Sequence, residues 1–250
     1  MNITTSIERI LGIVAMTATL VFYSCEKPEG PGGRGVIKGQ VIQQTYDRGF
    51  RVQQSEFPAA DEDVYIIYGS GQTISDDRST TPEGRFEFQY LSKGDYRIYV
   101  YSEDSTGESA SGMIPVERSV NLSSNKQEVD LGEIFISRTL EVDEGQATIG
   151  GKVMQVNYAK GFVYIIDTIP AQDIDVYLIY EDDPHYFDRI RTLYDGSYSY
   201  PKLIKGTYTI YVYSEDINRG SELIPLKKNL EVDAVRGVFD SGIFYISKED

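Results

Sequence analysis

The nine residues YRIYVYSED, which start at Tyr96, return as YTIYVYSED at Tyr208. Eight of the nine positions are identical, and the offset is 208 − 96 = 112 residues. The same offset aligns DVY at Asp63 with DVY at Asp175, and the last apolar runs keep it within two residues. A match of this length predicts a tandem duplication. Two copies are too few for a solenoid, so each copy is expected to be a self-contained domain that folds alone.

Apolar and polar residues alternate within each copy, which is the pattern of β-strands. In the repeated stretch, Tyr96, Ile98 and Val100 share one face, and Tyr99 and Tyr101 lie on the other. Gly, Pro, Asp and Ser separate such runs, and no stretch after residue 30 keeps helical spacing long enough for a helix. A copy of about 105 residues has room for seven or eight strands, which predicts an all-β sandwich.

A denser pattern fills the second part of each copy, EGRFEFQYLSKGDYRIYVYSED from Glu83 and DGSYSYPKLIKGTYTIYVYSED from Asp195. It resembles the glycine, aromatic, leucine, glycine, tyrosine signature of transthyretin-like sandwiches, which include carboxypeptidase regulatory-like domains and B-type repeats of bacterial surface proteins. The resemblance implies two tandem Greek-key β-sandwiches, at 35–139 and 140–250, and it is specific for fold rather than for function. Between its first strand and its DVY strand, each copy has about twenty residues that the transthyretin-like pattern does not include. We interpret them as an extra hairpin with Gly49 or Gly161 in its turn.

The N-terminal segment has the layout of a secretion signal. An apolar run of about a dozen residues begins at Ile10, and Ser24 stands directly before Cys25, the only cysteine. The run is short for a membrane span but suits a signal peptide. It resembles a relaxed, Bacteroidetes-type lipoprotein signal, which implies that residues 1–24 are removed and that Cys25 is acylated. An ordinary secretory signal with an incidental cysteine is the alternative.

The ten residues 25–34 are rich in Pro, Gly and charge, and they predict a solvated tether. Together with acylated Cys25, this tether predicts a lipid-anchored protein at the cell surface on a bacterial outer membrane. The formal net charge of −15 argues against a nucleic-acid partner, because a phosphate binder needs a basic patch.

Side chains for catalysis are scarce. His185 is the only histidine and lies in a polar loop, which excludes a His-based triad in both copies and a His-rich zinc site. Carboxylates collect in loops at Asp76 and Glu181, which leaves calcium binding open, although no calcium-loop spacing is present. We predict no enzyme activity, no cofactor and no catalytic or metal site.

The repeated strand leaves one functional question. Its outward face carries tyrosines in both copies, and Tyr101 and Tyr213 lie nearest the acidic end, so they are the candidates for a binding face. Packing between rings is the competing explanation. The predicted function is a non-enzymatic, anchored spacer or adhesion module that binds a glycan or another surface protein. The alternative is an accessory carbohydrate-binding lipoprotein of a polysaccharide-uptake system.

Overall fold

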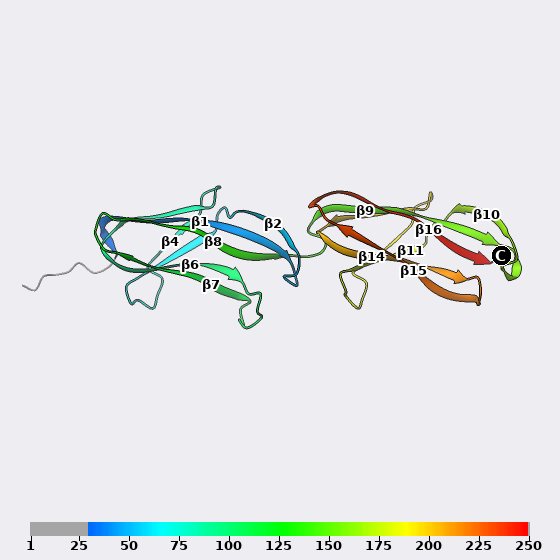
Figure 1. The fold of residues 1–250 in the computed structure, drawn as a ribbon, viewed down its shortest axis with the longest axis horizontal. Helices are drawn as coiled ribbons and strands as arrows, with labels where there is room; N and C mark the ends of the chain where they lie inside the picture. The colour runs from blue at the N-terminus through cyan, green and yellow to red at the C-terminus, as the bar shows by residue number, and fades with distance from the viewer. Residues whose placement is uncertain (1–29, 250) are drawn as a thin grey trace, which may run out of the picture.

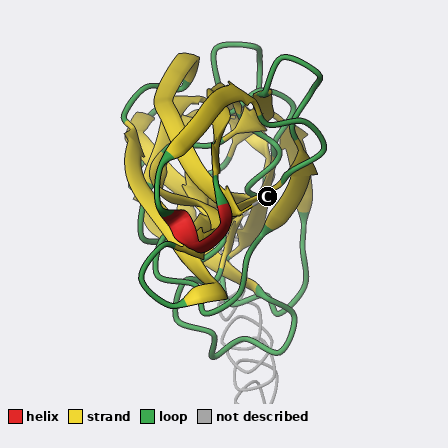
Figure 2. Ribbon diagram, turned by 90° about the vertical axis from the view of Figure 1, so that its right-hand side faces the viewer, coloured by secondary structure: helices red, strands yellow, loops and turns green. Residues whose placement is uncertain are grey.

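The computed structural model describes residues 30–249, so the predicted signal peptide and Cys25 lie outside the described residues. Two all-β halves follow one another along the long axis, with Gly30 and Glu249 at opposite ends (Figure 1). The view along that axis shows the strands at the centre and the loops around them (Figure 2). Within the described residues, no helix is long and apolar enough to cross a membrane.

Eight strands build the first half. They are β1 (Pro31–Asp47), β2 (Gln53–Pro58), β3 (Asp63–Tyr68), β4 (Asp76–Ser79), β5 (Arg85–Leu91), β6 (Gly94–Glu103), β7 (Met113–Leu122) and β8 (Glu128–Leu140). One sheet is built around β1, which pairs with β8 in parallel and with β5 and β2 antiparallel. The other sheet has the order β4-β3-β6-β7 and is antiparallel throughout.

The second half repeats this arrangement. Its elements are β9 (Gln146–Tyr158), the 3-10 turn η1 (Lys160–Phe162), β10 (Ile165–Pro170), β11 (Asp175–Tyr180), β12 (Asp188–Arg191), β13 (Ser197–Leu203), β14 (Gly206–Asp216), β15 (Gly220–Val232) and β16 (Arg236–Glu249). Here β9 pairs with β16 in parallel and with β13 and β10 antiparallel, and β12-β11-β14-β15 form the second sheet. The predicted all-β architecture of paired sheets is confirmed in both halves.

Each half has a hydrophobic core of its own between its two sheets, built from residues 37–136 in the first and 147–246 in the second. Tyr96, Ile98 and Val100 are buried in the first core, as the alternation predicts. At about 25 cal/mol for each Å² of apolar surface removed from water, these inward faces are the main source of stability. Each copy of the duplicated sequence therefore forms one hydrophobic core.

The extra hairpins are present, and they extend the sheet of β1 and of β9 beyond the sandwich. β1 pairs with β2, and β9 pairs with β10. Phe50 and Phe162 take the left-handed conformation at equivalent positions of the two turns, with φ of 54° and 55°, and Gly161 also has a positive φ of 77° whereas Gly49 does not. The predicted tether is shorter than expected, because β1 already begins at Pro31 and pairs there with Leu91.

Candidate functional site

The outward face of β6 carries a cluster of three tyrosines. Register places Tyr65 of β3 opposite Tyr99 of β6, and their ring centroids are 5.1 Å apart in a stacked arrangement. Tyr101 meets both rings edge-on, at 5.8 Å from Tyr65 and 5.5 Å from Tyr99. Offset stacks and edge contacts are the favourable geometries for aromatic pairs. Tyr99 is therefore buried although it points away from the core, while Tyr101 stays 38% exposed.

The second half builds the same cluster with one more ring. Tyr177 and Tyr211 stack with centroids 4.7 Å apart and planes 8° from parallel. Tyr213 meets them edge-on at 5.8 Å and is 43% exposed. Tyr186, from the loop before β12, adds a ring 5.3 Å from Tyr177, and the Lys227 ammonium lies 5.9 Å from the Tyr211 centroid. We call the two clusters the tyrosine faces.

Burial affects the ionisation of three rings in the tyrosine faces. Loss of water contact raises the pKa of Tyr65, Tyr99 and Tyr211 above the ordinary value, because the charged phenolate is poorly solvated there. These three rings stay neutral at physiological pH. Ring planes and hydroxyls of this kind are suited to stacking on an apolar or sugar surface.

The outward-facing tyrosines of β6 and β14 therefore have two different surroundings. Tyr99 and Tyr211 each pack against two neighbouring rings, which explains the aromatic side chains at these positions. Tyr101 and Tyr213 are exposed and lie at equivalent positions of β6 and β14, and Tyr186 is a further exposed ring in the second face. The structure does not bring Tyr101 and Tyr213 into one site, since each belongs to its own half. Any ligand site at these rings is present twice.

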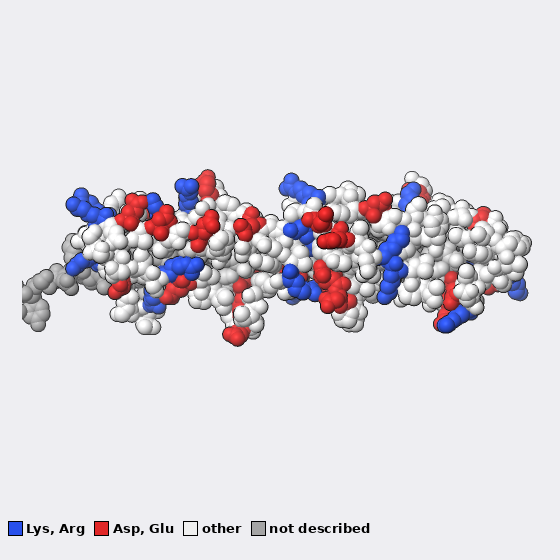
Figure 3. Space-filling model, in the orientation of Figure 1, with Lys and Arg blue, Asp and Glu red and all other residues white. Residues whose placement is uncertain are grey.

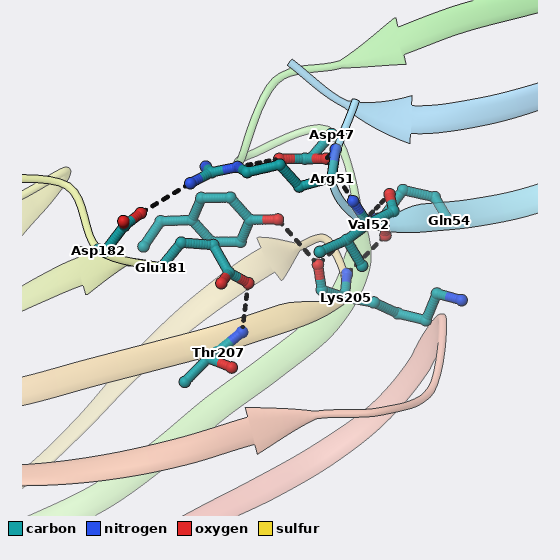
Figure 4. Close-up of polar contacts among 9 residues, drawn as sticks. Asp47, Arg51, Val52, Gln54, Glu181, Asp182, Lys205 and Thr207 are labelled. Atoms are coloured by element: carbon teal, nitrogen blue, oxygen red, sulfur yellow. Dashed lines mark hydrogen bonds and ion pairs between the residues drawn. The ribbon is translucent and has the colours of Figure 1, made fainter. Parts of the chain in front are cut away.

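A second group of residues connects the two halves, and the sequence did not predict it. Figure 4 shows the first hairpin reaching the near end of the second half. The Gln54 side chain pairs with the backbone of Lys205 in both directions: its amide donates to the Lys205 carbonyl at 3.0 Å, and its oxygen accepts from the Lys205 N–H at 2.7 Å. Tyr180 donates its hydroxyl to the same carbonyl at 3.1 Å. We call this contact the junction.

Charges frame the junction. Arg51 lies between two carboxylates, 2.7 Å from the Asp182 oxygen and 3.4 Å from that of Asp47. Asp47 is itself buried, and its carboxylate accepts the backbone N–H groups of Arg51 and Val52, which folds the hairpin tip. The exposed Arg51–Asp182 pair contributes only about 0.2–1 kcal/mol, so the buried Gln54 amide is the stronger element.

Acidic side chains of both predicted loops form ion pairs, and Asp76 begins β4 rather than lying in a loop. Asp182 pairs with Arg51, and Asp76 lies 3.3 Å from Arg78. Across residues 30–249, no group of three or more His, Cys, Asp or Glu side chains is close enough together to hold a metal ion. His185 is exposed in its loop. Calcium binding at Glu181 or Asp76 thus has no clustered ligand set in the described part of the chain.

Comparisons with known proteins give only distant likenesses. No protein-family model matches the sequence, and no curated protein matches it significantly. Among solved structures it is similar to the Bacillus anthracis TIE protein, at 11% identity and a TM-score of 0.26, over 85% of this chain and 34% of that one. A streptococcal ancillary pilin matches at 13% identity and a TM-score of 0.29, over 82% and 62%. The minor pilin of Streptococcus agalactiae matches at 12% and 0.28, over 85% and 94%.

The chain thus spans about a third of the first of these proteins and less than two thirds of the second. At these identities and scores the likenesses carry no argument about function.

Proposed function

We propose that the protein is a non-enzymatic surface module in which two β-sandwiches act as a stiff spacer that presents its far end or faces for adhesion. The junction is the observation that supports this proposal. It holds the halves end to end, with Gly30 at one end and Glu249 at the other. A spacer needs such a fixed alignment, because a flexible pair of domains does not set a defined height.

The proposal places the protein on an outer membrane through lipid on Cys25. Acyl chains contribute about 0.8 kcal/mol for each buried CH₂, so two or three chains hold a protein on a bilayer durably. Residues 26–29 then leave a short connection to β1, which begins at Pro31.

Replacing Cys25 by Ser is expected to move the protein from the membrane fraction to the soluble fraction, because no acyl chain is then attached. Detergent phase partitioning and incorporation of labelled palmitate by cells that express the full chain measure this change. Ser24→Ala is the matched control, since a small residue before the cysteine is retained, and it is expected to stay in the membrane. Equal detergent partitioning of the Cys25→Ser variant and the unaltered chain would refute the anchor.

A second candidate function, glycan binding, is favoured by exposure at Tyr101 and Tyr213. Aromatic rings supply large contact area to sugar faces at low entropic cost, and these two rings lie at the exposed margin of stacked supports. The edge contacts with buried Tyr99 and half-buried Tyr211 support their orientation. This arrangement supports the alternative of an accessory carbohydrate-binding component of a polysaccharide-uptake system.

The Tyr101→Ser, Tyr213→Ser double variant separates packing from binding. If the rings form a platform, retention on immobilised polysaccharides falls at least about tenfold while the melting temperature changes by only a few degrees. Tyr90→Ser and Tyr194→Ser are matched controls, because both rings are more exposed than the test pair and lie elsewhere. A loss of stability with unchanged retention would assign the two rings to packing.

A further inference from the structure

The two tyrosine faces differ in the charged residues that flank their stacked rings. In the first half, Tyr65 of β3 lies opposite Tyr99 of β6. The same row across the sheet continues to Asp77 of β4 on one side and to Glu117 of β7 on the other. Residues that lie directly opposite one another on neighbouring strands point to the same side of a sheet. A carboxylate therefore flanks each of the two stacked tyrosines, and both acidic residues are exposed.

The equivalent row of the second half has the opposite charge. Register places Arg189 of β12 opposite Tyr177, and Lys227 of β15 opposite Tyr211. Tyr177 and Tyr211 lie opposite each other, as their counterparts do. The row thus reads acid, Tyr, Tyr, acid in the first half and base, Tyr, Tyr, base in the second. The two copies share the rings and differ in the sign of the charge on both sides of them.

The first row stays acidic when its neighbours are included. Asp63 lies two residues before Tyr65 on β3, so it points to the same side of the sheet. Burial raises the pKa of Tyr65, and the carboxylates of Asp63 and Asp77 raise it further, which is consistent with negative charge close to the ring. Arg97 lies 3.8 Å from Glu117 and offsets one of the three carboxylates.

The second row keeps an excess of positive charge. Arg191 lies two residues after Arg189 on β12 and adds a third cation on the same side. Asp175 lies 3.5 Å from Arg189 and 3.1 Å from Arg191, and it offsets part of this charge. Asp173 pairs with Arg191 at 2.9 Å. Within residues 30–249, no carboxylate forms an ion pair with Lys227, and its ammonium lies 5.9 Å from a ring centroid of the stacked pair.

The chemistry of the second row fits an acidic sugar chain. Basic and acidic side chains are interspersed along both halves in the view of Figure 3, so the contrast belongs to the two rows rather than to whole halves. Four neighbouring strands span about 14 Å, which is longer than a single sugar ring. Tyrosine rings offer flat area to a sugar, and Arg and Lys make charge-assisted hydrogen bonds to carboxylates. At physiological ionic strength charges are screened beyond about 8 Å, so a ligand on the row meets these cations rather than the net charge of −15.

We propose that the second row, formed by Arg189, Tyr177, Tyr211 and Lys227, binds polysaccharides whose sugars carry carboxylates. The first row does not bind them, because its own carboxylates repel the ligand. Since the cations lie at both ends of the second row, the sugar chain is expected to cross the strands and to place a carboxylate at each end. This assignment rests on glycan binding, the second candidate function, and specifies its ligand class.

Retention of the full chain on immobilised polygalacturonate tests the proposal, with fully methyl-esterified polygalacturonate as the reference. The two polymers have the same sugar rings, and only the first has free carboxylates. The unaltered chain is expected to bind polygalacturonate at least about fivefold more tightly, the effect of two exposed ion pairs. The Arg189→Asp, Lys227→Glu variant carries the acidic residues of the first row at equivalent strand positions. It is expected to lose the preference and to keep its affinity for the methyl ester.

Two further variants control this comparison. Lys152→Glu, Arg236→Asp changes the net charge by the same amount, and both residues are exposed on the other sheet of the second half. This control is expected to keep the preference for polygalacturonate. The reciprocal variant, Asp77→Arg, Glu117→Lys, is expected to restore binding to a chain whose second row has been reversed. Circular dichroism shows whether each variant is folded before it is compared.

The outcomes separate the acidic ligand from glycan binding itself. Retention that weakens in the Tyr101→Ser, Tyr213→Ser variant but not after charge reversal would keep glycan binding and overturn the acidic ligand. Equal losses in the reversed variant and in the control would assign the preference to net charge and also overturn it. Retention on polyglutamate as strong as on polygalacturonate would point to an acidic polypeptide instead. No retention on either sugar polymer would overturn both glycan binding and the acidic ligand.

Discussion

Replacing Tyr208 by Ala is expected to lower the free energy of unfolding of the second half by about 3–5 kcal/mol. The Tyr208 ring is fully buried in the second core, and its centroid lies 5.2 Å from that of Tyr180. Its hydroxyl donates to the Ile204 carbonyl at 2.9 Å, so truncation leaves a cavity and an unpaired buried acceptor. Urea unfolding followed by tyrosine fluorescence and circular dichroism measures the change.

Two variants separate the sources of this loss. Tyr208→Phe keeps the ring and removes one hydrogen bond, so it is expected to cost about 1 kcal/mol. Tyr213→Ala, on the outward face of the same strand, is expected to cost less than Tyr208→Ala, because Tyr213 is partly exposed. Because the cores are separate, the first half is expected to lose at most the coupling that the junction supplies. A Tyr208→Ala protein with the stability of the unaltered chain would mean that the ring is not buried in solution.

The inward faces of the strands were predictable because a period of two leaves little choice. Once Tyr96 points inward, Ile98 and Val100 follow, and the repeat transfers the assignment to the second half. Alternation also placed Tyr99 outward, but it could not reveal that stacking on Tyr65 buries the ring. That contact depends on which strand lies beside β6, and this is a property of topology rather than of local pattern.

Long-range pairings could not be predicted from the sequence, because they too depend on topology rather than on local pattern. The parallel pairing of β1 with β8 joins residues about ninety positions apart, and the junction contact of Gln54 with Lys205 spans 151. Neither contact can be predicted from the alternation within a single strand. The sequence did contain one signal for the junction. RVQQ from Arg51 and VYII from Val163 occupy equivalent positions in the two hairpins and differ at every position. Such a divergence between otherwise similar copies indicates that the two tips have different surroundings.

The junction variant Arg51→Ala, Gln54→Ala is expected to turn one stiff body into two loosely connected ones. Gln54 is buried and makes two hydrogen bonds to the Lys205 backbone, so its loss leaves both backbone groups without this partner. The change costs about 1–3 kcal/mol of coupling between the halves. Without that coupling, the connection between β8 and β9 no longer holds a single orientation.

Pulsed electron resonance between nitroxides at Arg118 and Glu231, both exposed and in different halves, measures this orientation in a chain without Cys25. A narrow distance distribution is expected for the unaltered junction, and a broad one for the double variant. Gln53→Ala is the matched control, because Gln53 is the exposed neighbour of Gln54 and is expected to leave the distribution narrow. A narrow distribution in the double variant would show that the connecting segment alone aligns the halves, and the junction would then lose its role in the spacer.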